Sequence, residues 1–190
     1  MNTEFTVEVL DSITGEEAEE AWEGYNTSYR DYNNQTPIKQ SMRKDDFLSA
    51  LSNSAFKKVT VRDSSGEIVA IGVCTFDLEQ LPWISAAFFR HNFPEEYGRI
   101  LHLAGLYVRP DKRGLKASIP LMLGIRQLCR DSGGRMVGFD CSLKLQSWLP
   151  GVVMRATGGR PIGGAFESGE LDRQAYFLLE DTELRSNTQT

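Results

Sequence analysis

Cysteine is scarce in this chain of 190 residues, which holds three, at Cys74, Cys129 and Cys141. Their odd number and wide separation exclude a disulfide framework and match no common spacing of metal ligands. Each lies among apolar neighbours, so we expect three reduced cysteines in the core and no metal site.

Long apolar runs and a basic N-terminus are also missing. No segment approaches the roughly 20 apolar residues that cross a bilayer, and residues 1–4 lack the start of a secretory signal. We therefore expect a cytoplasmic protein without a membrane partner. The 21 lysines and arginines are outnumbered by 26 acidic residues, which gives a net charge of -5. This balance argues against a general nucleic-acid binder.

Hydrophobic periodicity and turn signals predict one mixed α/β domain over residues 1–180 and a polar tail over residues 181–190. Strands are predicted over residues 5–10, 58–62, 68–76, 100–108, 136–141 and 174–179, with a further strand that begins at Pro161. Helices are predicted over residues 15–29, around Phe47 to Leu51, after the turn at residues 109–117, and over residues 142–157. We therefore expect a central mixed, mostly antiparallel sheet of about six to seven strands, flanked by about four helices.

The most informative segment runs from Gly105 to Ser118 and carries the sequence GLYVRPDKRGLKAS. It is typical of a buried strand, a tight basic turn and the beginning of a helix, with Ser118 as the expected N-cap and Pro120 in the first turn. Such a turn directs several backbone N–H groups to one point at the positive end of the helix dipole. We therefore expect this segment to bind a phosphorylated ligand.

The element order and this segment resemble the GNAT superfamily of acyl-CoA-dependent N-acetyltransferases. The sequence LYVRPDKRG at residues 106–114 looks like the family's fourth strand and the opening of its pyrophosphate loop, and GGRPIG at residues 158–163 looks like its step into the sixth strand. The family loop reads Arg/Gln-x-x-Gly-x-Gly/Ala. Arg113 and Gly114 fit its start, whereas Lys116 and Ser118 stand at the two later glycine positions.

This resemblance implies that strands four and five separate and that the pantetheine arm of acetyl-CoA, the co-substrate, lies between them. The arm would bind along the backbone of Leu106, Tyr107 and Val108, and a free backbone N–H in the gap would stabilise the thioester oxyanion. The residues implied to hold the pyrophosphate are Arg113, Gly114, Leu115, Lys116, Ala117 and Ser118.

Attack by an amine on a thioester requires a proton acceptor, and the departing thiolate requires a proton donor. Counting in twos back from Leu106 places His102 on the same strand face, so His102 can act as the base, directly or through a water. The alternative is a hydrogen-bonded histidine in a core strand. The family's thiol-protonating tyrosine has no counterpart over residues 140–164. Ser142 is the substitute candidate, and helix capping is its alternative role.

Tyrosines in and after the first predicted helix fall in the region that lines the acceptor site in the GNAT family. The resemblance therefore implies that Tyr29 and Tyr32 stack on or hydrogen-bond to an acceptor. The same tyrosines can instead pack at helical spacing, and for Tyr25 we favour packing.

These features lead to three hypotheses. The first is an acetyl-CoA-dependent N-acetyltransferase in which the amine of a small molecule or protein attacks directly. The sequence identifies no acceptor, and it is compatible with a homodimer. The second is a GNAT-fold binding or structural protein without turnover, viral proteins included, motivated by the replaced glycines and the missing tyrosine. The third is a nucleotide- or phosphate-binding protein of another α/β type, although the chain has no Walker pattern or dinucleotide glycine triplet.

Overall fold

The computed structural model describes residues 5–34, 41–109 and 115–140 of the chain. In this part, the strands are β1 (Thr6–Leu10), β2 (Lys57–Arg62), β3 (Ile68–Thr75), β4 (Ile100–Val108) and β5 (Met136–Phe139). The helices are α1 (Glu16–Asn33), α2 (Lys44–Ser52), α3 (Ala86–Asn92) and α4 (Leu115–Asp131), and a short 3₁₀ helix, η1, spans Leu78–Gln80. The first five predicted strands are thus present, with nearly the predicted ends.

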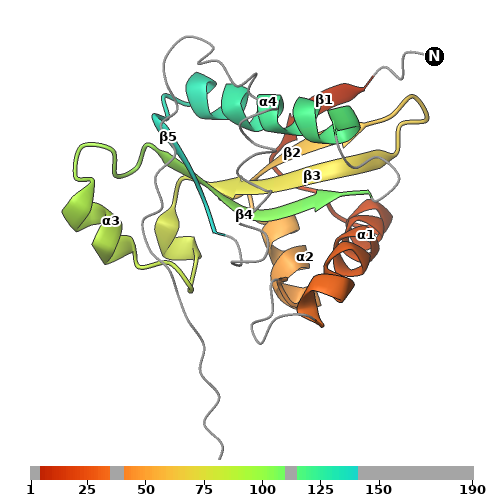
Figure 1. Ribbon diagram of the computed structural model, residues 1–190, viewed down its shortest axis with the longest axis horizontal. Helices are drawn as coiled ribbons and strands as arrows, with labels where there is room; N and C mark the ends of the chain where they lie inside the picture. Colours follow the sequence, from red (N-terminus) through yellow and green to blue (C-terminus); the bar gives the residue numbers. More distant parts are fainter. Residues whose placement is uncertain (1–4, 35–40, 110–114, 141–190) are drawn as a thin grey trace, which may run out of the picture.

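The strands form one sheet in the order β1-β2-β3-β4-β5 (Figure 1). Neighbouring strands are antiparallel from β1 to β4, and β5 runs parallel to β4. This arrangement confirms the prediction of a mixed, mostly antiparallel sheet flanked by helices. The predicted helix over residues 142–157 and the two last predicted strands lie outside the described residues.

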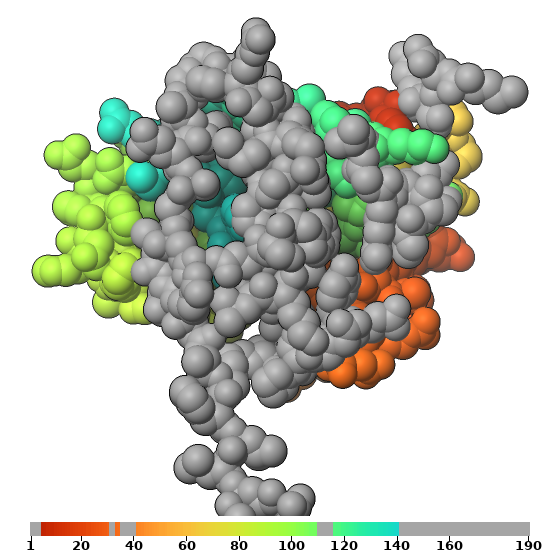
Figure 2. All heavy atoms as spheres, viewed as in Figure 1, coloured from red at the N-terminus to blue at the C-terminus, as the bar shows by residue number. Residues whose placement is uncertain are grey.

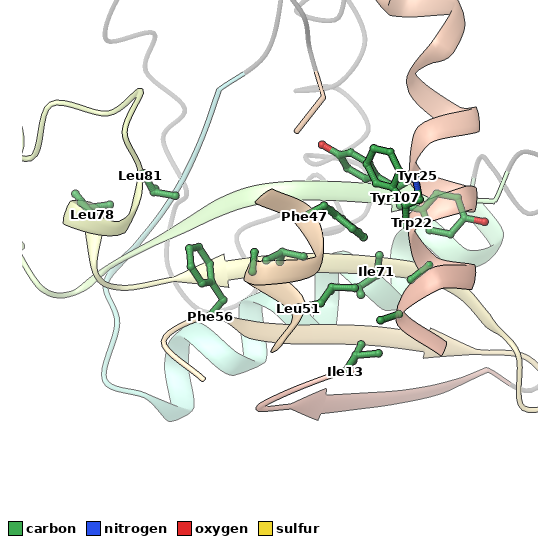
Figure 3. Close-up of a cluster of buried hydrophobic side chains, with 14 of the residues drawn as sticks. Ile13, Trp22, Tyr25, Phe47, Leu51, Phe56, Ile71, Leu78, Leu81 and Tyr107 are labelled. Atoms are coloured by element: carbon green, nitrogen blue, oxygen red, sulfur yellow. The ribbon is translucent and has the colours of Figure 1, made fainter. Parts of the chain in front are cut away.

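Helices cover both faces of the sheet, with α4 across one face and α1 and α2 against the other (Figure 1). The core under α4 includes Val59, Val61, Cys74, Leu101 and Leu121. Figure 3 shows the second core, which joins α1 and α2 to the sheet and includes Trp22, Tyr25, Phe47, Leu51 and Ile71. This two-sided burial explains why β3 is apolar along almost its whole length.

Two of the three cysteines belong to the core under α4. Cys74 and Cys129 are buried and free, as predicted, and Cys141 lies outside the described residues. Within the described ranges, no helix is long and apolar enough to cross a membrane. The same ranges contain no group of three side chains that could hold a metal ion.

Helix α4 begins earlier than the sequence predicts. Ser118 is not the N-cap, because the helix starts at Leu115 and Ser118 is a buried residue inside it. Leu115, Lys116 and Ala117 have high helix propensity, which allows the helix to begin before the serine. Pro120 consequently lies beyond the first turn, where its missing N–H leaves the carbonyl of Lys116 without the usual helical donor.

A buried lysine joins three segments at one corner of the sheet. Lys58 of β2 is fully buried. Its ammonium donates hydrogen bonds to the backbone oxygens of Asp11, Asn53 and Phe56 at 2.8, 2.7 and 2.8 Å. These oxygens belong to the segment after β1, the C-terminus of α2 and the turn before β2. Because carbonyls at a helix C-terminus attract cations, the lysine ties α2 to the sheet.

Replacing Lys58 with methionine is expected to destabilise the fold, because one buried and two partly buried carbonyl oxygens lose their donor while the apolar stem is kept. We expect a loss of about 2 kcal/mol in the free energy of unfolding, measured by chemical denaturation. Lys57→Met is the matched control, since Lys57 lies on the same strand in an exposed ion pair with Asp11 and should change little. Equal losses in the two variants would contradict the role of Lys58.

The same lysine predicts a pH dependence of stability. Burial lowers the pKa of Lys58 from its ordinary value of 10.5 to about 8. Between these pKa values the unfolded chain binds more protons than the folded protein, so the free energy of unfolding should rise as the pH increases from 8 toward 10.5. Thermal unfolding across this range should show a smaller rise in Lys58→Met, and an identical rise would count against this explanation.

Candidate active site

The parallel strands β4 and β5 are paired over only the first part of β4. Residues 100–103 pair with residues 136–139, where β5 ends, whereas β4 continues to Val108. On its other side, β4 stays paired with β3 as far as Val108. In the described part of the chain, residues 104–106 therefore have a strand partner on one side only. Their backbone N–H and C=O groups on the other side can bind a ligand.

Strand β4 also contains a bulge at the point where its pairing with β5 ends. Val73 and Cys74 of β3 are opposite Gly105 and Leu103 of β4, so Ala104 is an extra residue in this pairing. A bulge leaves the extra residue out of the regular ladder and bends the strand locally. The irregular backbone and the gap beside β5 thus occur at the same place.

The bulge changes which side chains share a face of β4. Leu103 and Leu106 both pack in the core under α4, whereas Ala104 packs in the core under α1 and α2. His102, next to Leu103, faces the side of α1 and α2. The prediction that His102 and Leu106 share a face was therefore wrong, because counting in twos assumes a strand without a bulge.

Helix α4 begins at the end of the sheet toward which β4 runs and which β5 does not reach (Figure 1). The N–H groups of Leu115, Lys116 and Ala117 have no intrahelical acceptor, because they belong to the first turn. Lys116 is exposed and has an ordinary helical backbone, since no non-glycine residue in the described ranges has a positive φ. The start of α4 therefore presents N–H donors and one ammonium group.

The predicted phosphate-binding residues are only partly within the described chain. Arg113 and Gly114 lie outside it, and so does the side chain of Leu115. Ala117 and Ser118 are buried. Ala117 can therefore contribute to ligand binding through its backbone, whereas Lys116 can also contribute through its side chain.

His102 lies beside the last residues of β5. It is 3% exposed, and its Nε2 donates a hydrogen bond to Oδ1 of Asp140, which follows β5, at 3.2 Å. A Cβ added at Gly138 would lie 3.1 Å from Nδ1 of His102, so the glycine leaves space for the imidazole. In the described part of the chain, nothing hydrogen-bonds to this buried Nδ1.

Asp140 is the exposed partner in its hydrogen bond with His102, and 64% of its side chain is accessible to solvent. The indole Nε1 of Trp83, in the loop before α3, donates to the same Oδ1 at 3.3 Å. Partial burial raises the pKa of the Asp140 carboxyl, but hydrogen bonds from His102 and Trp83 outweigh this effect and hold the pKa below its ordinary 3.8. Asp140 is therefore a carboxylate at neutral pH.

Tyr25 of α1 lies over the bulge. A Cβ added at Gly105 would lie 3.7 Å from Cε of Met42 and 3.8 Å from Cε2 of Tyr25. The Tyr25 ring stacks on Phe47 with centroids 4.3 Å apart, and its hydroxyl accepts a hydrogen bond from the Met42 N–H at 3.1 Å. Burial raises the pKa of Tyr25 to about 12, so the hydroxyl stays protonated. The predicted packing of Tyr25 is confirmed.

Tyr29, Tyr32 and Ser142 are the other residues that the sequence predicts for the site. Tyr29 is half-buried, with its ring centroid 4.8 Å from that of Tyr25. Tyr32 belongs to α1, but its side chain lies outside the described part of the chain, as does all of Ser142. The space-filling view shows the described residues of α3 and α1 at opposite edges of the molecule (Figure 2).

Comparison with known proteins gives matches in structure. No protein-family model matches the chain, and no curated protein matches its sequence. The aminoglycoside N-acetyltransferase AAC(6')-Iy in complex with CoA is similar in structure, with 13% identity and a TM-score of 0.55, over 95% of this chain and 98% of that chain. The chain has the GNAT fold.

Two further solved structures share the GNAT fold with this chain. AAC(6')-Iy in complex with a bisubstrate analogue is 14% identical, with a TM-score of 0.52 over 94% of this chain and 100% of that chain. An aminoglycoside acetyltransferase from an uncultured soil metagenomic sample, in complex with sisomicin, is 11% identical. Its TM-score is 0.51, over 93% of this chain and 97% of that chain.

In this GNAT fold, Asp140 is a functional candidate that the sequence did not indicate. A single aspartate after a strand has no informative spacing, and its partners His102 and Trp83 lie 38 and 57 residues away along the chain. The available signal is Gly138, because a glycine inside a strand often marks the close approach of another group.

Gly138→Ala is expected to displace the imidazole of His102, because the new Cβ would contact Nδ1 too closely. NMR spectra should show a change in the ring signals of His102, whereas those of His91, the other histidine, should not change. Gly105→Ala is the matched control, because its Cβ would make only ordinary contacts of 3.7 Å or more. Unmoved His102 signals in Gly138→Ala would contradict the described geometry.

Proposed function

We propose that the protein is an N-acetyltransferase that uses acetyl-CoA as co-substrate and transfers the acetyl group to an amine. The observation that carries this proposal is the one-sided pairing of β4 over residues 104–106, beside the bulge and near the start of α4. The GNAT fold supports the same assignment, because similar solved structures include an acetyltransferase in complex with CoA.

Each part of acetyl-CoA has a chemically suitable counterpart in this region. The pantetheine amides fit the side of β4 beyond its pairing with β5, where the backbone of Ala104, Gly105 and Leu106 can hydrogen-bond as to a neighbouring strand. Tyr107 and Val108 stay predictions for the same role. The pyrophosphate fits the N–H groups at the start of α4, together with the preceding turn. The exposed ammonium of Lys116 adds a positive charge there. Arg113, Gly114 and Ser118 stay predictions for the same role.

Acetyl transfer by direct attack forms a C–N bond and breaks the C–S bond of the thioester. A backbone N–H near Ala104 is suited to stabilise the oxyanion that forms on the carbonyl. The attacking nitrogen gives up a proton, and the departing thiolate takes one. The sequence predicts His102 for the first step and Ser142 for the second. The protonated hydroxyl of Tyr25, whose ring lies beside the bulge, is a further candidate for the second step.

The acceptor amine is expected to approach from the face of the sheet that carries α1 and α2. His102 and Tyr25 lie on that face, and Tyr29 is packed beside Tyr25. Tyr29 and Tyr32 stay predictions for contacts with the acceptor. The amine belongs to a small molecule or to a protein. Among the similar structures, one acetyltransferase holds the aminoglycoside sisomicin.

Lys116→Glu is expected to weaken acetyl-CoA binding about tenfold or more, because it places a negative charge beside the pyrophosphate. Calorimetric titration measures this change. Arg130→Glu makes the same change of charge at the opposite end of α4 and should bind acetyl-CoA as the wild type does. Arg113→Glu should weaken binding in the same way as Lys116→Glu. Unchanged affinity in both of these loop variants would exclude the proposed phosphate site.

Turnover is tested by incubating the protein with acetyl-CoA and pools of amines and then measuring the free thiol of CoA. Thiol release that depends on an amine is the expected result. Binding of acetyl-CoA without turnover in any pool would instead favour a GNAT-fold binding protein. Binding of ATP or NAD in place of CoA would favour the third hypothesis. Native mass spectrometry of the purified protein provides a direct check for coenzyme carried over from the cell.

A further inference from the structure

Asp140, Trp83 and His102 form a hydrogen-bonded group at the end of β5, beside the point where β4 and β5 part. Both donors, Nε1 of Trp83 and Nε2 of His102, are directed to Oδ1 of Asp140. Among the described residues, the further donor to this carboxylate is the backbone N–H of Asp140 itself, and no other residue donates to Oδ2. The carboxylate is thus held firmly through one oxygen, while the second oxygen can accept a hydrogen bond from a ligand.

The geometry of His102 argues against a direct role as base. Its Nε2 is engaged with Asp140, so the lone pair of the neutral imidazole is on Nδ1. That nitrogen is buried beside Gly138, on the β5 side of the ring. An acceptor amine therefore meets the exposed carboxylate before it can meet a free nitrogen of the imidazole.

The charge of Asp140 indicates which part of an acceptor it suits. A carboxylate favours the charged form of a neighbouring amine, whereas the attacking nitrogen must be neutral. Asp140 is therefore better suited to an ammonium group that does not react. Trp83, 48% exposed, adds an aromatic ring beside the carboxylate, and indole rings attract cations.

We propose that Asp140 binds a second, charged amino group of the acceptor and that His102 is the positioning residue that holds Asp140. The acceptor is accordingly a diamine or polyamine, in which one nitrogen is anchored as an ammonium while another is acetylated. This proposal rests on the proposed acetyl transfer. It names the substrate class of the same site and moves His102 from the base to the support of a binding group.

A pair of amines of equal length tests this class of acceptor. The probes are 1,5-diaminopentane and pentylamine, which differ by the second amino group, and spermidine, which carries three. With acetyl-CoA, the wild type should acetylate the diamine with a kcat/KM about tenfold higher than the monoamine, mainly through KM. Calorimetry on the CoA-bound protein should show binding of spermidine. Equal use of the two short amines, or no binding of spermidine, would overturn the proposal.

Asp140→Asn keeps the size of the side chain and removes its charge. The variant should lose the preference for the diamine and bind spermidine about tenfold more weakly, with binding of acetyl-CoA unchanged. Glu95→Gln, which removes the charge of an exposed carboxylate after α3, is the matched control and should behave as the wild type. A preference for the diamine that persists in Asp140→Asn would exclude Asp140 as the anchor.

Two substitutions of His102 separate positioning from proton transfer. His102→Gln keeps an N–H donor toward Asp140, and His102→Leu removes it. If His102 is a positioning residue, His102→Gln should retain most of the preference for the diamine. His102→Leu should abolish this preference. If glutamine lowers kcat as much as leucine does, His102 acts as the base and this assignment is wrong.

The same measurements distinguish failure of this proposal from failure of the proposed function. A wild-type protein that does not bind acetyl-CoA would refute the acetyltransferase, whatever its affinity for spermidine. A wild type that binds acetyl-CoA and acetylates amines without preference for the diamine would refute only the ammonium anchor.

Discussion

The short parallel pairing between β4 and β5 is the constraint on which the rest of the candidate site depends. β5 pairs with four residues of β4 and then ends, while β4 continues along β3 to Val108. Because the antiparallel side holds β4 in place, its other side can stay open without loss of the strand. The backbone groups of residues 104–106 on that side require another partner. A ligand that carries amide groups is a chemically suitable partner.

The two faces of the sheet supply different chemistry to this opening. On one face, α4 brings the N–H groups of its first turn and the ammonium of Lys116, which suit phosphate. On the other face lie His102, the hydroxyl of Tyr25 and the carboxylate of Asp140 at the end of β5. A phosphorylated thioester and a cationic amine carry opposite charges. The separation of positive and negative groups therefore allows both ligands to be bound without mutual interference.

The sequence predicts the framework well, because the framework depends on local patterns. The apolar run of residues 100–108 and the turn between β2 and β3 are visible in the residues themselves. The bulge at Ala104 is not visible, since it depends on pairing with β3, and it reverses the face assigned to His102 relative to Leu106. Asp140 is missed for a similar reason, because its partners come from distant segments. Ser118 is misplaced because good helix formers before it extend the helix.

The replacement of glycine by Lys116 bears on whether the phosphate site is intact. Glycine at such a position is required when the backbone adopts a positive φ or when a side chain would block the ligand. Lys116 has an ordinary helical backbone, so the substitution introduces no strain. The Lys116 side chain is exposed, so it can move away from a bound ligand. Its ammonium attracts phosphate, whereas a glycine would only leave space for it. A lysine at this position is therefore compatible with coenzyme binding. Its ammonium would supply part of the attraction for the pyrophosphate that backbone N–H groups otherwise provide.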